Sequence, residues 1–190
     1  MPNGSGSYNA AMGNYSMFNN SSGSNNAAMG HYAHVTNTTG NNNVSIGFQS
    51  MLHAATPENS TIIGSTAAID MIEGNSNTII GYNTGGGIIS GNNNTIVGAN
   101  ISNLNPTLSN NIILSDGQGN IKAQHDGNDW DFTGSLKTGS IIGNSNTSTL
   151  SNFNYVINQQ NTNFTLSSGD NGRIISINSP STVTITITVP

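Results

Sequence analysis

Charged side chains are scarce in this chain of 190 residues, because Asp, Glu, Lys and Arg together make up 6% of it. Its three basic residues, Lys122, Lys137 and Arg173, all lie beyond residue 120. A protein that binds nucleic acid neutralises phosphates with clustered Lys and Arg, and the sequence contains no such cluster. We therefore expect no nucleic-acid partner.

Cysteine is absent, which excludes disulfides and thiolate metal ligands. No apolar run approaches the roughly 20 residues that a membrane-spanning helix needs, so we expect no membrane insertion. The N-terminal stretch from Met1 to Gly6 lacks the positively charged and apolar regions of a signal peptide. As written, the sequence does not predict export through a secretory pathway.

A short pattern that ends in an apolar residue followed by glycine recurs every 17 residues. Its glycines are Gly13, Gly30, Gly47, Gly64, Gly81 and Gly98, and Ser115 continues the series. Low charge and abundant Asn and Gly are also typical of disordered segments, but disorder predicts no apolar periodicity. A register held this long indicates a repeat architecture.

Seventeen residues suit one turn of a β-solenoid better than a helical repeat. Helical arrays have longer periods, and Gly, Asn and Thr are poor helix formers. Two short strands and two turns account for the length, with rungs stacked about 4.8 Å apart. We predict an all-β fold, a β-roll or β-solenoid of seven rungs over residues 1–115, with a second strand per rung near residues 49–54.

Side chains alternate between the two faces of a strand. We predict that the residues flanking the centre of each first strand fill the rung interior, namely Val44, Ile46, Ile63, Ile80, Val97 and Leu114. The central residue then faces outward, and from residue 62 onward it is isoleucine: Ile62, Ile79, Ile96 and Ile113. An outward apolar strip needs a partner, and copies of the chain packed around a rotation axis supply one.

An asparagine recurs two residues before the first strand of most rungs. It stands at Asn25, Asn42, Asn59, Asn93 and Asn110. Asn tolerates positive φ, so we place turns at these residues. We also expect their side-chain amides to form a hydrogen-bonded ladder along the solenoid.

The segment from Asn37 to Gly47 reads Asn-Thr-Thr-Gly-Asn-Asn-Asn-Val-Ser-Ile-Gly. It resembles the left-handed β-roll in the heads of trimeric autotransporter adhesins, the YadA-like family, and is most similar to a longer-period version found in phage tail fibres and bacterial surface fibres. The resemblance covers residues 9–115 and departs from the family pattern at residues 85–87 and at Pro106. It implies a homotrimer in which the middle residue of each strand faces the threefold axis.

Beyond the repeat, the sequence predicts two further β regions. Residues 116–149 are expected to form a small β-meander followed by a connector, because Asp-Gly turn signals at Asp116 and Asp126 alternate with short strands. Residues 150–190 are expected to form a C-terminal β module with strands at 154–157, 172–177 and 182–189. The chain ends without a visible closing strand, so we expect the native chain to be longer.

Acidic residues are the candidates for catalysis, because a fibre that cleaves glycans needs paired carboxylates. The N-terminal candidates are Glu58, Asp70 and Glu73. Asp70 lies one period after His53, so we interpret these two as a surface ion pair between rungs, which contributes little to stability. We predict no catalytic residue among them.

Two further groups could bind a metal or catalyse a reaction. His31 and His34 could bind a metal at a symmetry axis, but we expect them to be solvent-facing or packed. Asp126, Asp129 and Asp131 are expected to serve turns and a solvated strand face. We therefore predict no metal site and no cofactor.

Taken with the resemblance, these features predict a non-enzymatic structural protein. We expect a segment of a virion fibre, on a phage tail or head, that forms a rigid homotrimeric shaft. Its partners would be other virion or fibre proteins and a glycan or protein on the host cell surface. The alternative is a secreted bacterial trimeric adhesin on the bacterial cell surface, and the third is a glycan-degrading tailspike.

Overall fold

The computed structural model of the chain describes residues 5–134, 164–166 and 185–187. The chain divides into two compact units, Met1–Lys137 and Thr138–Pro190. All regular elements in the described ranges are strands, so the predicted all-β class is confirmed there.

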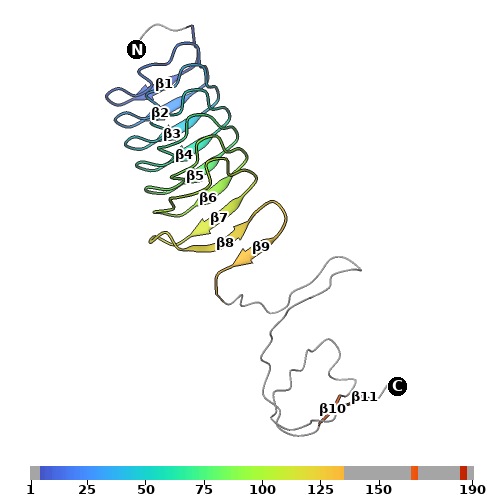
Figure 1. Cartoon of the computed structure of the whole chain (residues 1–190). Coiled ribbons are helices and arrows are strands. Elements are labelled where there is room, and N and C mark those ends of the chain that lie inside the picture. The colour runs from blue at the N-terminus through green and yellow to red at the C-terminus, as the bar shows by residue number, and fades with distance from the viewer. Residues whose placement is uncertain (1–4, 135–163, 167–184, 188–190) are drawn as a thin grey trace. The chain divides into compact units, whose positions relative to one another are not determined.

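The first unit contains seven parallel strands stacked in sequence order (Figure 1). They are β1 (Ala10–Met12), β2 (Ala27–Met29), β3 (Val44–Ile46), β4 (Thr61–Ile63), β5 (Thr78–Ile80), β6 (Thr95–Val97) and β7 (Ile112–Ser115). Each residue pairs with the residue 17 positions later, as Thr61 does with Thr78. The sequence therefore folds as a β-solenoid with the predicted 17-residue repeat, in which seven strands delimit six turns of the chain.

An antiparallel hairpin continues the same sheet beyond the last rung. Strand β8 (Ile121–His125) pairs with β7, and β9 (Trp130–Phe132) pairs with β8. The predicted β-meander is thus confirmed, and it ends the stack of parallel rungs. Gln124 Nε2 donates to Asn111 Oδ1 at 2.9 Å, which joins the hairpin to the final rung.

The turn between β7 and β8 depends on Asp116. Its Oδ1 accepts hydrogen bonds from the backbone N–H groups of Gln118 and Asn120 at 2.9 and 3.0 Å. The Asn120 side chain also donates to this carboxylate, and Lys122 Nζ lies 3.2 Å from it. These donors, the Asn120 side chain above all, hold the pKa of the Asp116 carboxyl well below its usual range.

In the second unit, β10 (Phe164–Leu166) pairs in parallel with β11 (Ile185–Ile187). Strand β11 falls within the strand predicted at 182–189. The connector predicted over 135–149 and the strands predicted at 154–157 and 172–177 lie outside the described residues.

The prediction of a second strand in each rung is wrong. Residues 48–53 form turns, and Gln49 and Met51 have φ values of 54° and 52°. Such alternating left-handed residues cannot form an extended strand. They still bond to neighbouring rungs, because Gln49 N–H donates to the carbonyl of His31 and Met51 N–H donates to that of Ala67, both at 3.0 Å.

The predicted assignment of strand faces is also wrong, because the central residue points into the rung. The fully enclosed central residues are Ile62, Ile79, Ile96 and Ile113, each 0% exposed. The residues predicted to fill the interior lie on the outer face, either half-buried or exposed: Val44, Ile46, Ile63, Ile80, Val97 and Leu114. A three-residue strand presents one side chain to one face and two to the other, and the narrow rung encloses the single one.

A small central residue is paired with a large residue six positions later, and a large central residue with a small one. Ser45 is followed by Met51, whereas Ile62 is followed by Ala68. Ile79 is followed by Gly85, where an added Cβ would lie 3.0 Å from Ile79 Cδ1. All these positions are buried, so large and small residues alternate across one interior and fill it at nearly constant volume.

A column of buried polar side chains runs beside this core and was not predicted. Its members are Asn26, Asn43, Ser60, Asn77, Asn94 and Asn111. Asn43 Nδ2 donates to Asn26 Oδ1 at 3.0 Å and to the Pro57 carbonyl at 2.7 Å, while Asn43 Oδ1 accepts from Ser60 N–H at 3.0 Å. Each Asn thereby links one rung to the next within the protein interior.

The asparagines predicted as turn residues immediately precede this column. All five have positive φ, between 55° and 62°. Asn42 Nδ2 donates to Asn59 Oδ1 at 3.2 Å, and Asn93 Nδ2 donates to Asn110 Oδ1 at 3.1 Å. These amide bonds are exposed, so the stronger contribution to stability comes from the buried neighbours.

Replacing one buried Asn should therefore destabilise the solenoid far more than replacing its exposed neighbour. Asn43→Ala leaves the Ser60 N–H and the Pro57 carbonyl without these partners, and we expect a loss of about 2–4 kcal/mol in the free energy of unfolding. Asn42→Gly keeps the positive φ and should cost less than about 1 kcal/mol. Urea unfolding followed by circular dichroism measures both, and equal losses would contradict the buried ladder.

His34 is a buried titratable residue with neither ring nitrogen hydrogen-bonded. It occupies the same column as Met17 and Met51, one rung away on each side, and all three are 0% exposed. Burial favours the neutral imidazole and lowers the pKa of His34 to about 4. Because the unfolded chain binds the proton more readily, stability is complete above pH 6.5 and falls as the pH drops from 6.5 through 4.

We expect His34 to account for a loss of about 2 kcal/mol in unfolding free energy between pH 7 and pH 5. His34→Met continues the Met column and should remove that loss. His53→Met, at an exposed position, should retain it. Urea unfolding at the two pH values gives the comparison, and an equal pH dependence in all three proteins would contradict the role given to His34.

Candidate functional surfaces

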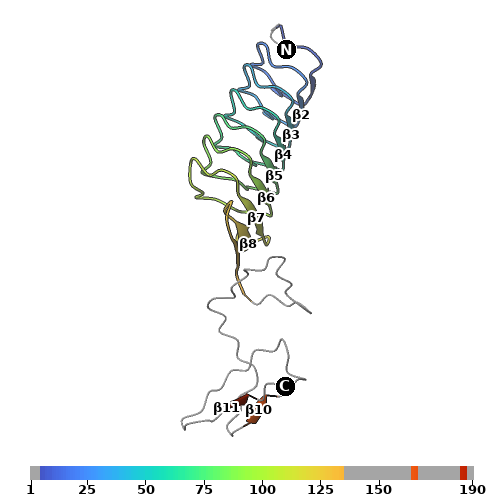
Figure 2. The same cartoon turned by 90° about the vertical axis from the view of Figure 1, so that its right-hand side faces the viewer.

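The rung strands stack along one wall of the solenoid (Figures 1 and 2). The sequence of these strands places an unbroken apolar column on their outer face. The column consists of the last or third residue of each rung strand: Met12, Met29, Ile46, Ile63, Ile80, Val97 and Leu114. We call it the outer strip. Its side chains are exposed or half-buried, with Ile80 and Val97 both 38% exposed.

The outer strip extends onto the terminal hairpin. Leu114 pairs with Ala123, which pairs with Phe132, so these three share a face. Trp130 lies beside Phe132 with ring centroids 5.6 Å apart, and the two side chains are 48% and 42% exposed. The apolar face thus runs from β1 to β9, and none of its residues is Asp, Glu, Lys or Arg.

A second exposed feature is a cluster of aromatic side chains on the turns that follow β1, β2 and β3. Tyr15 stacks on Tyr32 with ring centroids 5.1 Å apart, and it contacts Phe18 edge-on with ring centroids 5.2 Å apart. The ring centroid of His31 lies 4.2 Å from that of Tyr32 and 5.8 Å from that of Phe48, on which His31 stacks. We call these five residues the aromatic cluster; it was not predicted, although the offset of 17 between Tyr15 and Tyr32 could have revealed it.

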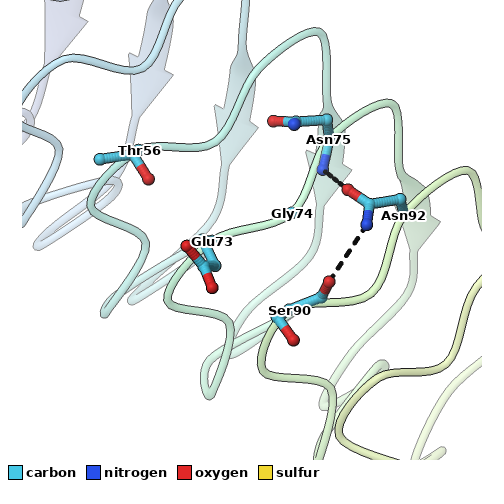
Figure 3. A pocket seen from close by; sticks show the side chains of 6 residues that line it. All are labelled: Thr56, Glu73, Gly74, Asn75, Ser90 and Asn92. Atoms are coloured by element: carbon cyan, nitrogen blue, oxygen red, sulfur yellow. Dashed lines mark hydrogen bonds between the residues drawn. The ribbon is translucent and has the colours of Figure 1, made fainter.

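A polar depression lies between successive rungs on another edge (Figure 3). It is lined by Thr56, Glu73, Gly74, Asn75, Ser90 and Asn92. The Asn92 amide is already used, because Oδ1 accepts from Asn75 N–H at 2.8 Å and Nδ2 donates to the Ser90 carbonyl at 3.2 Å. Glu73 is the single acid in the lining, whereas glycoside hydrolysis ordinarily requires two carboxyl groups.

Asp70 and Asp126 have structural contacts of their own. Asp70 Oδ2 accepts from Gly87 N–H one rung later at 2.9 Å, and it forms no ion pair with His53 in the described part of the chain, so that prediction is wrong. Asp126 Oδ1 accepts from the backbone N–H groups of Asp129 and Asn128, and these bonds, the one from Asp129 first, lower the pKa of the Asp126 carboxyl. Asp126 therefore closes the β8–β9 turn.

Two findings concern ligands and membranes. Within residues 5–134 and the two short strands of the second unit, no three His, Cys, Asp or Glu side chains come together as metal ligands would. His31 belongs to the aromatic cluster and His34 to the core, so the two do not form a joint site. The described ranges also contain no helix long and apolar enough to cross a membrane.

Comparison with protein-family models, with curated proteins and with solved structures finds no match to this chain. Its function must therefore be inferred from the surfaces themselves, together with the motif resemblance of residues 37–47.

Proposed function

We propose that this chain is a structural segment of a virion fibre, on a phage tail or head, in which three copies pack through the outer strip into a rigid shaft. The observation that carries the proposal is the outer strip itself, apolar in seven consecutive rungs and continued by Phe132 and Trp130. Contiguous apolar surface of this extent on a soluble protein marks an interaction site.

The regular geometry of the strip favours a second copy of the chain as its partner. Each rung adds a similar side chain at the same lateral position, so equivalent columns related by rotation meet rung by rung along their length. Burying the strip stabilises the assembly by about 25 cal/mol for each Å² of apolar surface removed from water. The column that contains Ile79 is fully buried within the chain and cannot contact another copy. The proposed axis therefore lies against the outer strip, which contains Ile80.

The threefold symmetry and the left-handed winding rest on the resemblance of residues 37–47 to YadA-like repeats. Within a virion, such a shaft would join other fibre proteins and contribute to attachment at a host-cell glycan or protein. Three identical chains present each contact three times, which strengthens weak binding through avidity.

The same trimeric shaft would also serve a secreted bacterial adhesin, because the motif occurs in both kinds of fibre. Antibodies raised against the purified chain distinguish the two locations. We expect labelling of fibres on purified phage particles, whereas labelling of bacterial surfaces in the absence of phage would support the adhesin instead.

Assembly through the outer strip can be tested with paired Ile→Asp substitutions. Ile63→Asp with Ile80→Asp should leave each rung folded but place charges where three strips meet, at a high cost in desolvation. We expect a trimeric mass for the native protein and a folded monomer for this variant, measured by light scattering and circular dichroism.

The matched control is Ile72→Asp with Ile89→Asp. These residues also lie 17 positions apart and are 50% and 40% exposed, but they project from turns rather than from the strand face. The control should remain trimeric. A native protein that is monomeric, or a strip variant that stays trimeric, would contradict assembly through this face.

A further inference from the structure

We propose that the aromatic cluster is a binding site for a neutral glycan, a chain of uncharged pyranose units on the host surface. The inference rests on the proposed attachment function and assigns its contact point to the turns that follow β1, β2 and β3. The cluster lies outside the outer strip, because its residues come after the glycine that ends each strand.

The rings are not explained by the core of the solenoid. Tyr15, Phe18 and Phe48 are 47%, 46% and 46% exposed. The interior beneath these turns is occupied by other residues, including Met17 and Ala33, both 0% exposed. Five contacting rings therefore form a partly exposed apolar surface that can contact a partner.

The orientation of the rings suits a puckered ligand better than a flat one. Tyr15 and Tyr32 are nearly parallel, with 6° between their planes, whereas Phe18 is inclined by 68° to Tyr15 and His31 by 56° to Tyr32. The ring planes thus lie at several angles to one another. A pyranose ring offers C–H groups to aromatic faces and hydroxyls around its rim, which such a surface can contact together.

The polar groups near the rings are uncharged hydrogen-bonding groups. Asn14 and Gln49 occupy the same columns as His31 and Tyr32, one rung away, and backbone bonds of 3.0 Å join these neighbouring turns. Residues 1–57 contain no Asp, Glu, Lys or Arg. A charged ligand would therefore find no Asp, Glu, Lys or Arg partner among these residues, whereas glycan hydroxyls can donate to and accept from amides and phenols.

The spacing of the site follows from the solenoid. Successive rungs repeat about every 4.8 Å, which is comparable with the length of one sugar unit in an extended chain. Rings from three rungs could then contact consecutive sugars of one glycan. In a trimer the cluster occurs three times, which compensates for the weak affinity expected of each exposed site.

The test measures binding of the purified protein to immobilised neutral oligosaccharides of hexose and N-acetylhexosamine, alongside sialylated and sulfated oligosaccharides. The variant combines Tyr15→Ala, Tyr32→Ala and Phe48→Ala. Its matched control is Tyr82→Ala, because Tyr82 lies two rungs beyond Phe48 in the same column and is 59% exposed. Mass by light scattering is recorded for each protein.

We expect at least one neutral oligosaccharide to bind the native protein. Affinity should fall by roughly tenfold or more in the triple variant, as expected for loss of central aromatic contacts, while Tyr82→Ala changes it by less than about twofold. All three proteins should have the same oligomeric state by light scattering. This pattern would support the cluster as the glycan site.

Several results would overturn the inference. They are binding restricted to charged oligosaccharides, no binding to any member of the panel, equal affinity in the triple variant, and a change of mass in that variant, which would make the cluster a subunit contact. Oligomeric mass and glycan binding are measured separately. A trimer that binds no glycan would therefore contradict the glycan site but not the trimeric shaft. A monomer whose glycan binding depends on the aromatic cluster would contradict the trimeric shaft but not the glycan site.

Discussion

The close approach of consecutive rungs at the glycine that ends each strand is the constraint on which the solenoid depends. These glycines have φ between 131° and 142°, and a Cβ at Gly47 or Gly64 would collide with the carbonyl group of the glycine one rung later. Glycine alone adopts this conformation without strain. The sharp turn it permits closes each rung after a three-residue strand, so one central side chain is enclosed and two remain outside.

The repeat, its length and the solenoid class could be predicted, because glycine spacing and apolar periodicity are properties of sequence. The enclosed face could not be deduced from that periodicity. Residues such as Ile79 and Ile80 are both apolar, and a period of two separates faces without saying which one is covered. The inverse sizes of Ser45 and Met51, and of Ile79 and Gly85, are the sequence signal that identifies the enclosed face. The sequence likewise does not say which of Asn42 and Asn43 is buried. In the structure Asn42 has a positive φ and is exposed, whereas Asn43 points into the interior.

The two ends of the solenoid differ in character. The core of the middle and C-terminal rungs is largely aliphatic, with Ile62, Ile79, Ile96 and Ile113 in contact with Met71 and Ile88 in one cluster. The N-terminal rungs enclose the unpaired imidazole of His34 and carry aromatic rings outside. An unpaired buried imidazole reduces stability, whereas the exposed rings beside it offer apolar surface to a partner.

The most direct test of the central claim, that the middle residue of each strand is enclosed and its neighbour is not, is the reactivity of single thiols in a chain without cysteine. Ile79→Cys and Ile80→Cys are each treated with a maleimide under native conditions over a range of protein concentrations. The thiol at position 79 should be protected at every concentration. The thiol at position 80 should react in dilute samples and become protected as the chains associate. A thiol at 79 that reacts in the folded protein while the one at 80 stays protected in dilute samples would contradict the account.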